Sequence, residues 1–337
     1  MRAKGIVVLV AAALATGTLA ACGQAPSSDG RSEVAQGGPA FLDAGARTAK
    51  YGTDALPGVF PRTITQAMGK TTLDHKPTRV VVLDTGELDN VVALGVQPVG
   101  VAFPDGSPNM PSYVGDKGGK PADVGTTNTL NLEAIAALKP DLILGSKLRA
   151  EKQYPLLAKI APTVFTERPG YTWKSNFRLN SAALDRTEQA DKMISDYEAA
   201  ARKLGQDAQA RLGTLPVISM LRFMPGRIRL YATKSFIGTV LADTGLPVTE
   251  SGKANDLAVE ISTEQIGKAD ADWILYGTYG DPGKTDQSGV LGGPLWSTLG
   301  AVKAGHAKAV PDETWYLGLG VLAANSVLTD LRGILRV

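Results

Sequence analysis

The sequence has few of the side chains that bind metals or form disulfides. Its 337 residues include one cysteine and two histidines. A disulfide framework needs cysteine pairs and a transition-metal cage needs several cysteine or histidine ligands, so neither can be built. A transition metal handled by this chain must therefore arrive already bound by another molecule, and we expect no direct metal ligand.

An excess of charge of one sign is also missing. The 35 Lys and Arg residues nearly balance the 33 Asp and Glu residues, and the formal net charge is +2. Proteins that bind nucleic acid usually carry a clustered basic surface, which nothing in this composition indicates. We therefore expect no nucleic-acid partner.

The common catalytic motifs are absent too. There is no Gly-x-Ser-x-Gly and no His-Glu-x-x-His, and a phosphate-loop reading of residues 283–285 fails because Thr278 stands where that motif needs glycine. We therefore expect no enzyme and no cofactor. A pair of carboxylates such as Asp84 and Asp281 leaves a secreted carboxylate-dependent hydrolase as the alternative from another class.

The N-terminus has the pattern of a secretory signal peptide. Residues 1–21 contain Arg2 and Lys4, then an apolar run over 6–14, then small residues. The apolar run is too short for a permanent membrane span. The only cysteine, Cys22, stands in Leu-Ala-Ala-Cys-Gly, which matches the lipobox of bacterial lipoproteins. We therefore expect a lipid on Cys22 and a place in the bacterial cell envelope, on the outer face of the cytoplasmic membrane.

Residues 187–212 predict one long helix. Apolar side chains recur every three or four residues, the spacing of a helix that buries one face. At about 1.5 Å per residue the helix would be about 39 Å long, enough to span two lobes. We therefore predict an N-terminal lobe over 58–186 and a C-terminal lobe over 213–337. A lipidated flexible tether is predicted over 22–57, because 24–52 are rich in Gly, Ser, Ala and Pro.

The N-terminal lobe has the pattern of a parallel α/β sheet. Apolar runs over 79–83 and 141–144 are typical of strands that are covered on both faces. Ligands bind beyond the carboxyl ends of such strands. Phe103, Lys147 and Arg149 follow predicted strand ends and are therefore candidate ligand contacts, although Phe103 could equally close the core.

The C-terminal lobe repeats this design. Residues 131–144 and 262–275 share their length, a capping residue, a glutamate, an isoleucine, an aspartate and a final Ile-Leu. A strand over 217–221 ends in Arg222 and Phe223. We therefore predict two Rossmann-like α/β lobes joined by one rigid helix, with a ligand cleft between the lobes.

These features together resemble a known family. With the lipobox, the passages 79–84, 94–101 and 131–141 resemble the substrate-binding lipoproteins of iron-siderophore and cobalamin ABC importers, and the resemblance extends over about residues 60–337. It implies a permease dimer as partner, with one glutamate on each lobe pairing with permease arginines. Here these would be Glu133 and Glu264, each of which also favours the positive end of its own helix. We expect a monomer.

The resemblance implies that the ligand is a metal chelate. We expect a ferric hydroxamate siderophore such as ferrioxamine or ferrichrome, because its compact apolar body suits an aromatic cup and one or two arginines. In the hydroxamate branch an arginine meets the chelate oxygens, and Arg222 is the candidate. A ferric catecholate is the close alternative and cobalamin a further one. The expected siderophore-binding residues are Arg222, Phe223, Trp173, Tyr276, Tyr279, Phe103, Lys147, Arg149 and Trp315.

Overall fold

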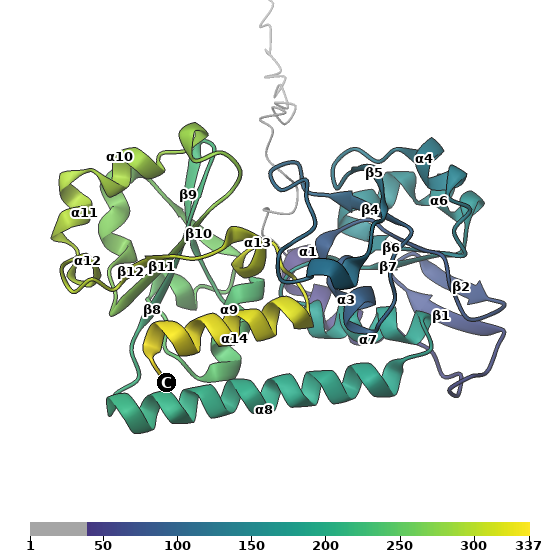
Figure 1. Cartoon of the computed structure of the whole chain (residues 1–337), viewed down its shortest axis with the longest axis horizontal. Coiled ribbons are helices and arrows are strands. Elements are labelled where there is room, and N and C mark those ends of the chain that lie inside the picture. Colours follow the sequence, from purple (N-terminus) through teal and green to yellow (C-terminus); the bar gives the residue numbers. More distant parts are fainter. Residues whose placement is uncertain (1–38) are drawn as a thin grey trace, which may run out of the picture. The chain divides into compact units, whose positions relative to one another are not determined.

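The computed structural model describes residues 39–337 (Figure 1). The predicted signal peptide, the predicted lipidation site Cys22 and the first part of the predicted tether lie outside the described residues. Across the described range, no helix combines the length and apolarity that crossing a membrane requires.

The N-terminal lobe contains a parallel sheet with strand order β5-β4-β3-β6-β7. Alternate residues of β3 and β6 enter two different cores, which explains why both strands are apolar throughout. One core lies against α3 and α7, and the other against α4 and α6. The strands are β3 (Val80–Val82), β4 (Gly100–Phe103), β5 (Ala122–Thr126), β6 (Leu142–Ser146) and β7 (Thr163–Thr166), and the helices are α3 (Thr85–Ala93), α4 (Leu132–Ala137), α6 (Tyr154–Ile160) and α7 (Trp173–Ala183).

Shorter elements complete this lobe. An antiparallel hairpin of β1 (Arg62–Gln66) and β2 (Gly69–Leu73) precedes the sheet. A one-turn helix, α5 (Lys147–Ala150), follows β6 directly. It places the two basic residues predicted as ligand contacts at the carboxyl end of a strand.

The C-terminal lobe contains a mixed sheet with strand order β10-β9-β8-β11-β12. Strands β8, β11 and β12 are parallel, whereas β9 and β10 run antiparallel to their neighbours, with β8 and β9 forming a hairpin. The strands are β8 (Ile218–Met224), β9 (Arg227–Tyr231), β10 (Ala258–Ile261), β11 (Trp273–Thr278) and β12 (Ala307–Ala309). The predicted α/β class is confirmed, although the helix that echoes α4 is a 3₁₀ helix, η5 (Thr263–Ala269).

The helices of the C-terminal lobe lie on both sides of its sheet. In Figure 1, α9 and α14 lie between the sheet and α8, while α10, α11 and α12 lie on the outer side of the lobe. They are α9 (Phe236–Thr244), α10 (Gln287–Leu291), α11 (Pro294–Thr298), α12 (Gly300–Lys303), α13 (Asp312–Trp315) and α14 (Val321–Leu335).

Helix α8 (Thr187–Leu212) runs beneath both lobes and has the predicted bounds. It packs against α7 of the N-terminal lobe and against α9 and α14 of the C-terminal lobe. Its buried side chains, Ala190, Ile194, Tyr197, Ala201, Leu204 and Ala208, all belong to the predicted apolar face, whereas Leu212 of the same face is exposed.

An aromatic cluster joins the two lobes on this helix. Trp173, the first residue of α7, packs edge-on against Tyr197 of α8 and Phe236 of α9, with ring centroids 5.1 and 5.9 Å apart. The Trp173 indole also donates a hydrogen bond to Thr239 Oγ1 at 2.9 Å. Next to it, Lys174 pairs with carboxylates of α8 and α9 at 2.8 and 2.9 Å. We call these contacts the α7–α8–α9 joint.

A second connection runs between α3 and α14. Asp89 of α3 accepts hydrogen bonds from the backbone N–H groups of Leu322 and Ala323 at 3.0 and 2.9 Å, and so caps the N-terminus of α14. A Cβ at Gly320 would lie 2.3 Å from the Asp89 carboxyl, so only glycine fits there. Gly320, the second glycine of the Gly-Leu-Gly sequence at 318–320, therefore allows α3 to pack against the start of α14.

The part of the predicted tether that the structure describes is packed onto the protein. Residues 39–48 form α1 (Pro39–Leu42) and α2 (Ala44–Thr48), and the Phe41 ring is buried under the Arg168 guanidinium, 3.8 Å from it. The Tyr171 hydroxyl donates a hydrogen bond to the Phe41 carbonyl at 2.6 Å. The expectation of a flexible tether up to residue 57 therefore needs correction, because one aromatic residue in a small-residue segment is enough to anchor it.

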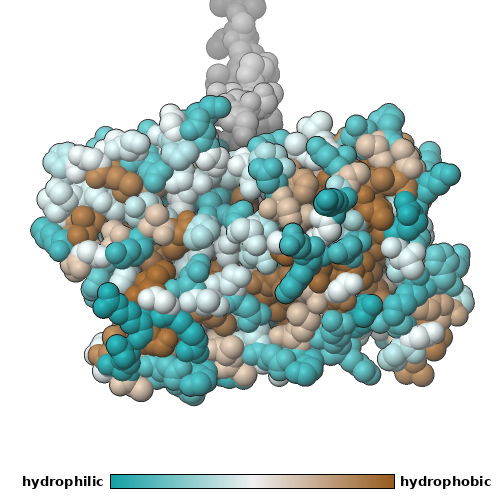
Figure 2. Space-filling model, viewed as in Figure 1, coloured by the Kyte–Doolittle hydropathy of each residue, from teal (hydrophilic) through white to brown (hydrophobic). Residues whose placement is uncertain are grey.

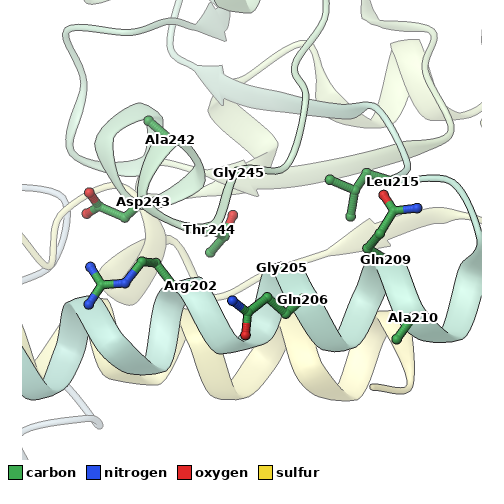
Figure 3. A pocket seen from close by; sticks show the side chains of 10 residues that line it. All are labelled: Arg202, Gly205, Gln206, Gln209, Ala210, Leu215, Ala242, Asp243, Thr244 and Gly245. Carbon is green, nitrogen blue, oxygen red and sulfur yellow. The ribbon is translucent and has the colours of Figure 1, made fainter.

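Helix α8 carries a glycine where α9 comes closest. A Cβ at Gly205 would lie 1.9 Å from the carbonyl oxygen of Thr244, at the end of α9. Figure 3 shows the two residues facing each other beside a cavity of about 530 Å³, whose lining includes none of the predicted ligand contacts. The close contact between helices offsets the lower helix propensity of glycine, about 1 kcal/mol relative to alanine.

We expect Gly205→Ala to lower the free energy of unfolding by about 1–3 kcal/mol, because the added methyl group meets backbone atoms that cannot move aside cheaply. Gly333 of α14 is the matched control, since a Cβ there has nothing within 4 Å. Gly333→Ala should stabilise the protein by about 0.5–1 kcal/mol. Urea unfolding of both variants measures the difference, and two shifts of the same sign would contradict the packing described.

Candidate ligand-binding site

The N-terminal lobe presents cations beyond the carboxyl end of β6. Arg149 of α5 forms an ion pair with Asp84, Nε to Oδ2 at 2.9 Å, and Lys147 pairs loosely with Glu151 at 3.7 Å. Asp84 follows β3 and also accepts a hydrogen bond from the Thr85 backbone N–H at 2.8 Å. The sequence therefore placed Lys147 and Arg149 correctly at a strand end, and the fold adds a buried carboxylate that orients the arginine.

A second arginine lies close to Arg149. Arg168 follows β7 and is 5% exposed. Burial and, to a lesser extent, the nearby charge of Arg149 lower the pKa of Arg168 to about 10, while Tyr171 and Asp256 act in the opposite direction. Two guanidinium groups held near each other in partly desolvated surroundings favour an anion beside them.

The C-terminal lobe contributes an arginine surrounded by tyrosines. The Arg222 guanidinium donates to both carboxylate oxygens of Asp312 at 2.6 and 2.5 Å, and to the Tyr231 hydroxyl at 2.9 Å. The rings of Tyr279 and Tyr316 lie 5.0 and 5.2 Å from it. Burial alone would lower the pKa of Arg222, but Tyr231 and Asp312 outweigh it and raise the pKa above its usual value. Arg222 is thus permanently charged and held by a fork of hydrogen bonds.

Tyr279 connects the two lobes at the strand ends. It follows β11, and its hydroxyl accepts a hydrogen bond from the Gly106 backbone N–H, beyond β4, at 3.1 Å. A Cβ at Gly106 would lie 2.5 Å from the tyrosine ring, so glycine is required for this approach. Phe103, at the end of β4, is half-buried and packs on the core of its lobe. The carboxyl ends of both sheets therefore meet here, as the sequence predicted.

Two predicted contacts lie on the other face of the C-terminal sheet. Successive residues of a strand point to opposite faces, so Phe223 points away from Arg222. Phe223 packs against Tyr276, and Tyr276 packs against Trp296, with ring centroids 6.2 and 5.9 Å apart. Phe223 and Trp296 are buried in the core on this face, and Tyr276 is half-buried against it. Phe223 is therefore a core residue rather than a rim residue, whereas the assignment of Tyr276 as a ligand contact stays a prediction.

Both predicted tryptophans are fully buried. Trp173 belongs to the α7–α8–α9 joint, and Trp315 of α13 donates a hydrogen bond from its indole to Asp330 of α14 at 2.8 Å. Their assignment to an aromatic cup needs correction. The signal for Trp173 was present in the sequence, since Trp173, Phe177 and Leu184 have helical spacing.

Several residues near Arg168 were missed. Phe41 stacks on its guanidinium, and the Lys234 ammonium lies 5.0 Å from the ring of Tyr171. Lys234 and Asp256 come from the C-terminal lobe, so this group of residues again joins the two lobes. No sequence signal connects residues that lie 63 to 127 positions apart, as Lys234 and Tyr171 or Phe41 and Arg168 do, and only the fold brings them together.

A second buried carboxyl group, that of Glu87, lies near Asp84, the partner of Arg149. Thr166 donates a hydrogen bond to Glu87 Oε1 at 3.4 Å, and within residues 39–337 Oε2 has no hydrogen-bond partner. Burial and the charge of Asp84 raise the pKa of Glu87 from 4.5 to about 8. Glu87 is therefore protonated at neutral pH, and Asp84 carries the negative charge that holds Arg149.

A direct metal site is not formed by the part of the chain that the structure describes. No group of three or more His, Cys, Asp or Glu side chains there could hold a metal ion. The groups available to a ligand are instead guanidinium groups and tyrosines.

The two predicted docking glutamates are both exposed. Glu133 lies in the first turn of α4, which Asn131 caps through the Ala134 N–H at 2.9 Å. Glu264 lies in the first turn of η5, where Ser262 and Gln265 form a capping box. Hydrogen bonds from Ser262 and, to a lesser extent, from its own backbone and Thr263 lower the pKa of Glu264, so it stays ionised.

The fold defines a two-lobed α/β protein built on one long helix, with polar side chains of both lobes at facing strand ends. The chain belongs to the periplasmic binding protein family, whose sequence profile matches residues 80–314. The resemblance expected from the sequence is thereby confirmed.

Individual relatives cover most of the chain. The probable siderophore-binding lipoprotein YfiY of Bacillus subtilis is 35% identical over 284 residues, 80% of this chain and 86% of that protein. The Fe(3+)-citrate-binding protein YfmC of the same species is 29% identical over 273 residues, 80% and 84% of the two chains. The crystal structure of Staphylococcus aureus SirA complexed with staphyloferrin B superposes with a TM-score of 0.72 at 31% identity, covering 81% and 98% of the two chains.

The buried Glu87 predicts a pH-dependent stability. A carboxyl group whose pKa is raised on folding stabilises the fold below its unfolded pKa, and this contribution is lost as the pH rises from about 4.5 toward 8. Glu87→Gln should therefore gain about 2–4 kcal/mol relative to the wild type between pH 5 and pH 8. Urea unfolding at the two pH values measures this, with Glu151→Gln on the surface as control. An unchanged difference at both pH values would show that Glu87 does not hold its proton.

Proposed function

We propose that the protein binds a ferric chelate outside the cytoplasmic membrane and delivers it to an ABC importer. Its family and the names of the relatives YfiY, YfmC and SirA support this, since these are named for siderophore or ferric citrate binding or were crystallised with staphyloferrin B. Cys22 would carry the lipid that keeps the protein at the membrane surface. The scarcity of cysteine and histidine agrees with a metal that stays wrapped in its chelator.

The charge of the site favours an anionic chelate. The observation that carries this proposal is the position of three basic residues at adjacent strand ends: Lys147 and Arg149 follow β6, and Arg168 follows the neighbouring parallel strand β7. A carboxylate-rich ferric complex, of which ferric citrate is the simplest, would accept charge-assisted and bidentate hydrogen bonds from such groups. This changes the preference from the sequence, because the aromatic cup on which the hydroxamate prediction depended loses Trp173, Trp315 and Phe223 to the cores.

Arg222 is better described as a fixed cation than as a free ligand arm. Asp312 and Tyr231 hold three of its five N–H groups, which leaves two for a ligand. Asp312 neutralises its charge, so Arg222 would orient a chelate oxygen rather than provide net attraction. In the N-terminal lobe, Arg149 and Lys147 are likewise paired with carboxylates, Asp84 and Glu151, and with Arg168 they would supply further hydrogen-bond donors to an anionic chelate.

Capture would involve little movement of the lobes. The α7–α8–α9 joint and the Asp89 cap of α14 both connect the lobes through buried contacts, and opening them would expose Trp173 and the Asp89 carboxyl group. A continuous helix also bends less readily than extended linkers. We therefore infer that ligand selection depends on side-chain and loop adjustments at the strand ends.

Calorimetric titration with four complexes tests the ligand class: ferric citrate, ferrioxamine, a ferric catecholate and cobalamin. We expect ferric citrate to bind most tightly. Arg168→Gln should weaken its binding at least tenfold, about 1.4 kcal/mol, because a charged partner is lost. Arg178→Gln is the control, since Arg178 pairs with Asp191 on the surface beside α8. Tighter binding of ferrioxamine would restore the hydroxamate assignment and reject this one.

A second experiment distinguishes ligand binding from transport. Glu133→Ala combined with Glu264→Ala should leave the affinity for ferric citrate unchanged, because both side chains are exposed and neither lies at the strand ends. Uptake of ⁵⁵Fe by cells that carry the double variant should fall to background. The single variants should each retain part of the uptake. Wild-type uptake by the double variant would refute the docking role.

A further inference from the structure

The two lobes repeat an exposed Pro-Leu pair. Helix α6 begins Tyr154-Pro155-Leu156, and helix α11 begins Pro294-Leu295. Leu156 and Leu295 are both 49% exposed. The residue that follows each leucine, Leu157 in one lobe and Trp296 in the other, is buried in the core of its lobe. In each lobe, therefore, the Pro-Leu pair exposes its leucine to solvent, and the next residue, which is buried, fixes the position of that leucine.

Each exposed leucine stands on the helix that packs beside a predicted docking glutamate. Helix α6 packs against α4, which carries Glu133, and α11 packs against η5, which carries Glu264. Figure 1 places α4 and α6 together at the upper side of one lobe and α11 on the other lobe. Figure 2 shows hydrophobic residues reaching the surface in the upper part of both lobes. The echo noted between residues 131–144 and 262–275 thus extends to a second helix in each lobe.

In the C-terminal lobe the predicted docking glutamate and the exposed leucine line the same cavity. Glu264 and Leu295 both line a cavity of about 490 Å³, together with Val290 and Pro294. Asp286 adds a second carboxylate to the same lining. An acidic rim around an apolar floor favours a partner that brings a cation and an apolar side chain together.

In the N-terminal lobe, apolar residues are also exposed on the two helices beside Glu133. They are Ala136 and Ala137 of α4 and Pro155 and Leu156 of α6. Such residues bury apolar area without the desolvation cost of charged groups. The lobe therefore offers one carboxylate with exposed apolar side chains on its own and the neighbouring helix.

We propose that Leu156 with Glu133, and Leu295 with Glu264, form two equivalent footprints that receive the two subunits of the importer's permease dimer. Each footprint would take an arginine on its glutamate and an apolar side chain on its leucine, both from a basic, partly apolar surface of the permease. This rests on the proposed function, and it adds the apolar half of the contact. The repetition in both lobes is what a two-fold symmetric partner requires.

The test measures binding of the full chain, without ligand, to its permease–ATPase complex in nanodiscs. Leu156→Gln and Leu295→Gln should each weaken binding at least fivefold, and the double variant more than twentyfold, because the buried apolar contact is lost. Leu212→Gln is the matched control: Leu212 is 44% exposed at the far end of α8 and should stay within twofold of the wild type. Calorimetry should give the two single leucine variants, the double variant and the Leu212→Gln control the same affinity for ferric citrate as the wild type.

The glutamate double variant separates the two proposals. If Glu133→Ala with Glu264→Ala abolishes binding while the leucine double variant binds like the wild type, the apolar footprint is overturned and the docking glutamates stand. Wild-type binding by both double variants would reject the docking assignment and the footprint together. No binding by the wild type would reject delivery to this importer, and the footprint with it.

Discussion

The packing of Trp173 against α8 and α9 is the contact on which the arrangement of the protein depends. The indole lies between Tyr197 and Phe236 and donates its N–H to Thr239, so one side chain of the N-terminal lobe is fixed to the interlobe helix and to the C-terminal lobe together. Lys174 and Asp243 reinforce it at the surface. Because these contacts join three helices, they connect both lobes to α8, and we propose that they hold the facing strand ends at one separation.

The site combines fixed charges of two kinds. In the C-terminal lobe Arg222 is balanced by Asp312, and in the N-terminal lobe Arg149 is balanced by Asp84 while Arg168 stands close by. The protonated Glu87 leaves Asp84 as the charged partner of Arg149. We propose that an anionic chelate binds between guanidinium groups of both lobes, with the tyrosines around Arg222 lining the C-terminal side.

The surface away from α8 is nearly symmetric. The glutamates and the exposed leucines repeat in both lobes although the sheets behind them differ, one fully parallel and one mixed. The repetition is what a two-fold partner would meet, whereas the basic and tyrosine side chains at the strand ends differ between the lobes.

The sequence by itself determined the features that depend on local pattern. The bounds of α8, the central strands β3, β6 and β8, and the repeat that carries Glu133 and Glu264 follow from spacing along the chain, because helix and strand periods are local properties. The edge strands β5, β10 and β12 were not predicted. Only the tertiary structure decided which face of β8 carries Arg222 and which carries Phe223, and that Trp173 and Trp315 close cores. Arg222 meets Asp312 ninety positions away, and Arg149 meets Asp84 sixty-five positions away. Such pairs depend on how the sheets and helices pack, and no local spacing specifies that.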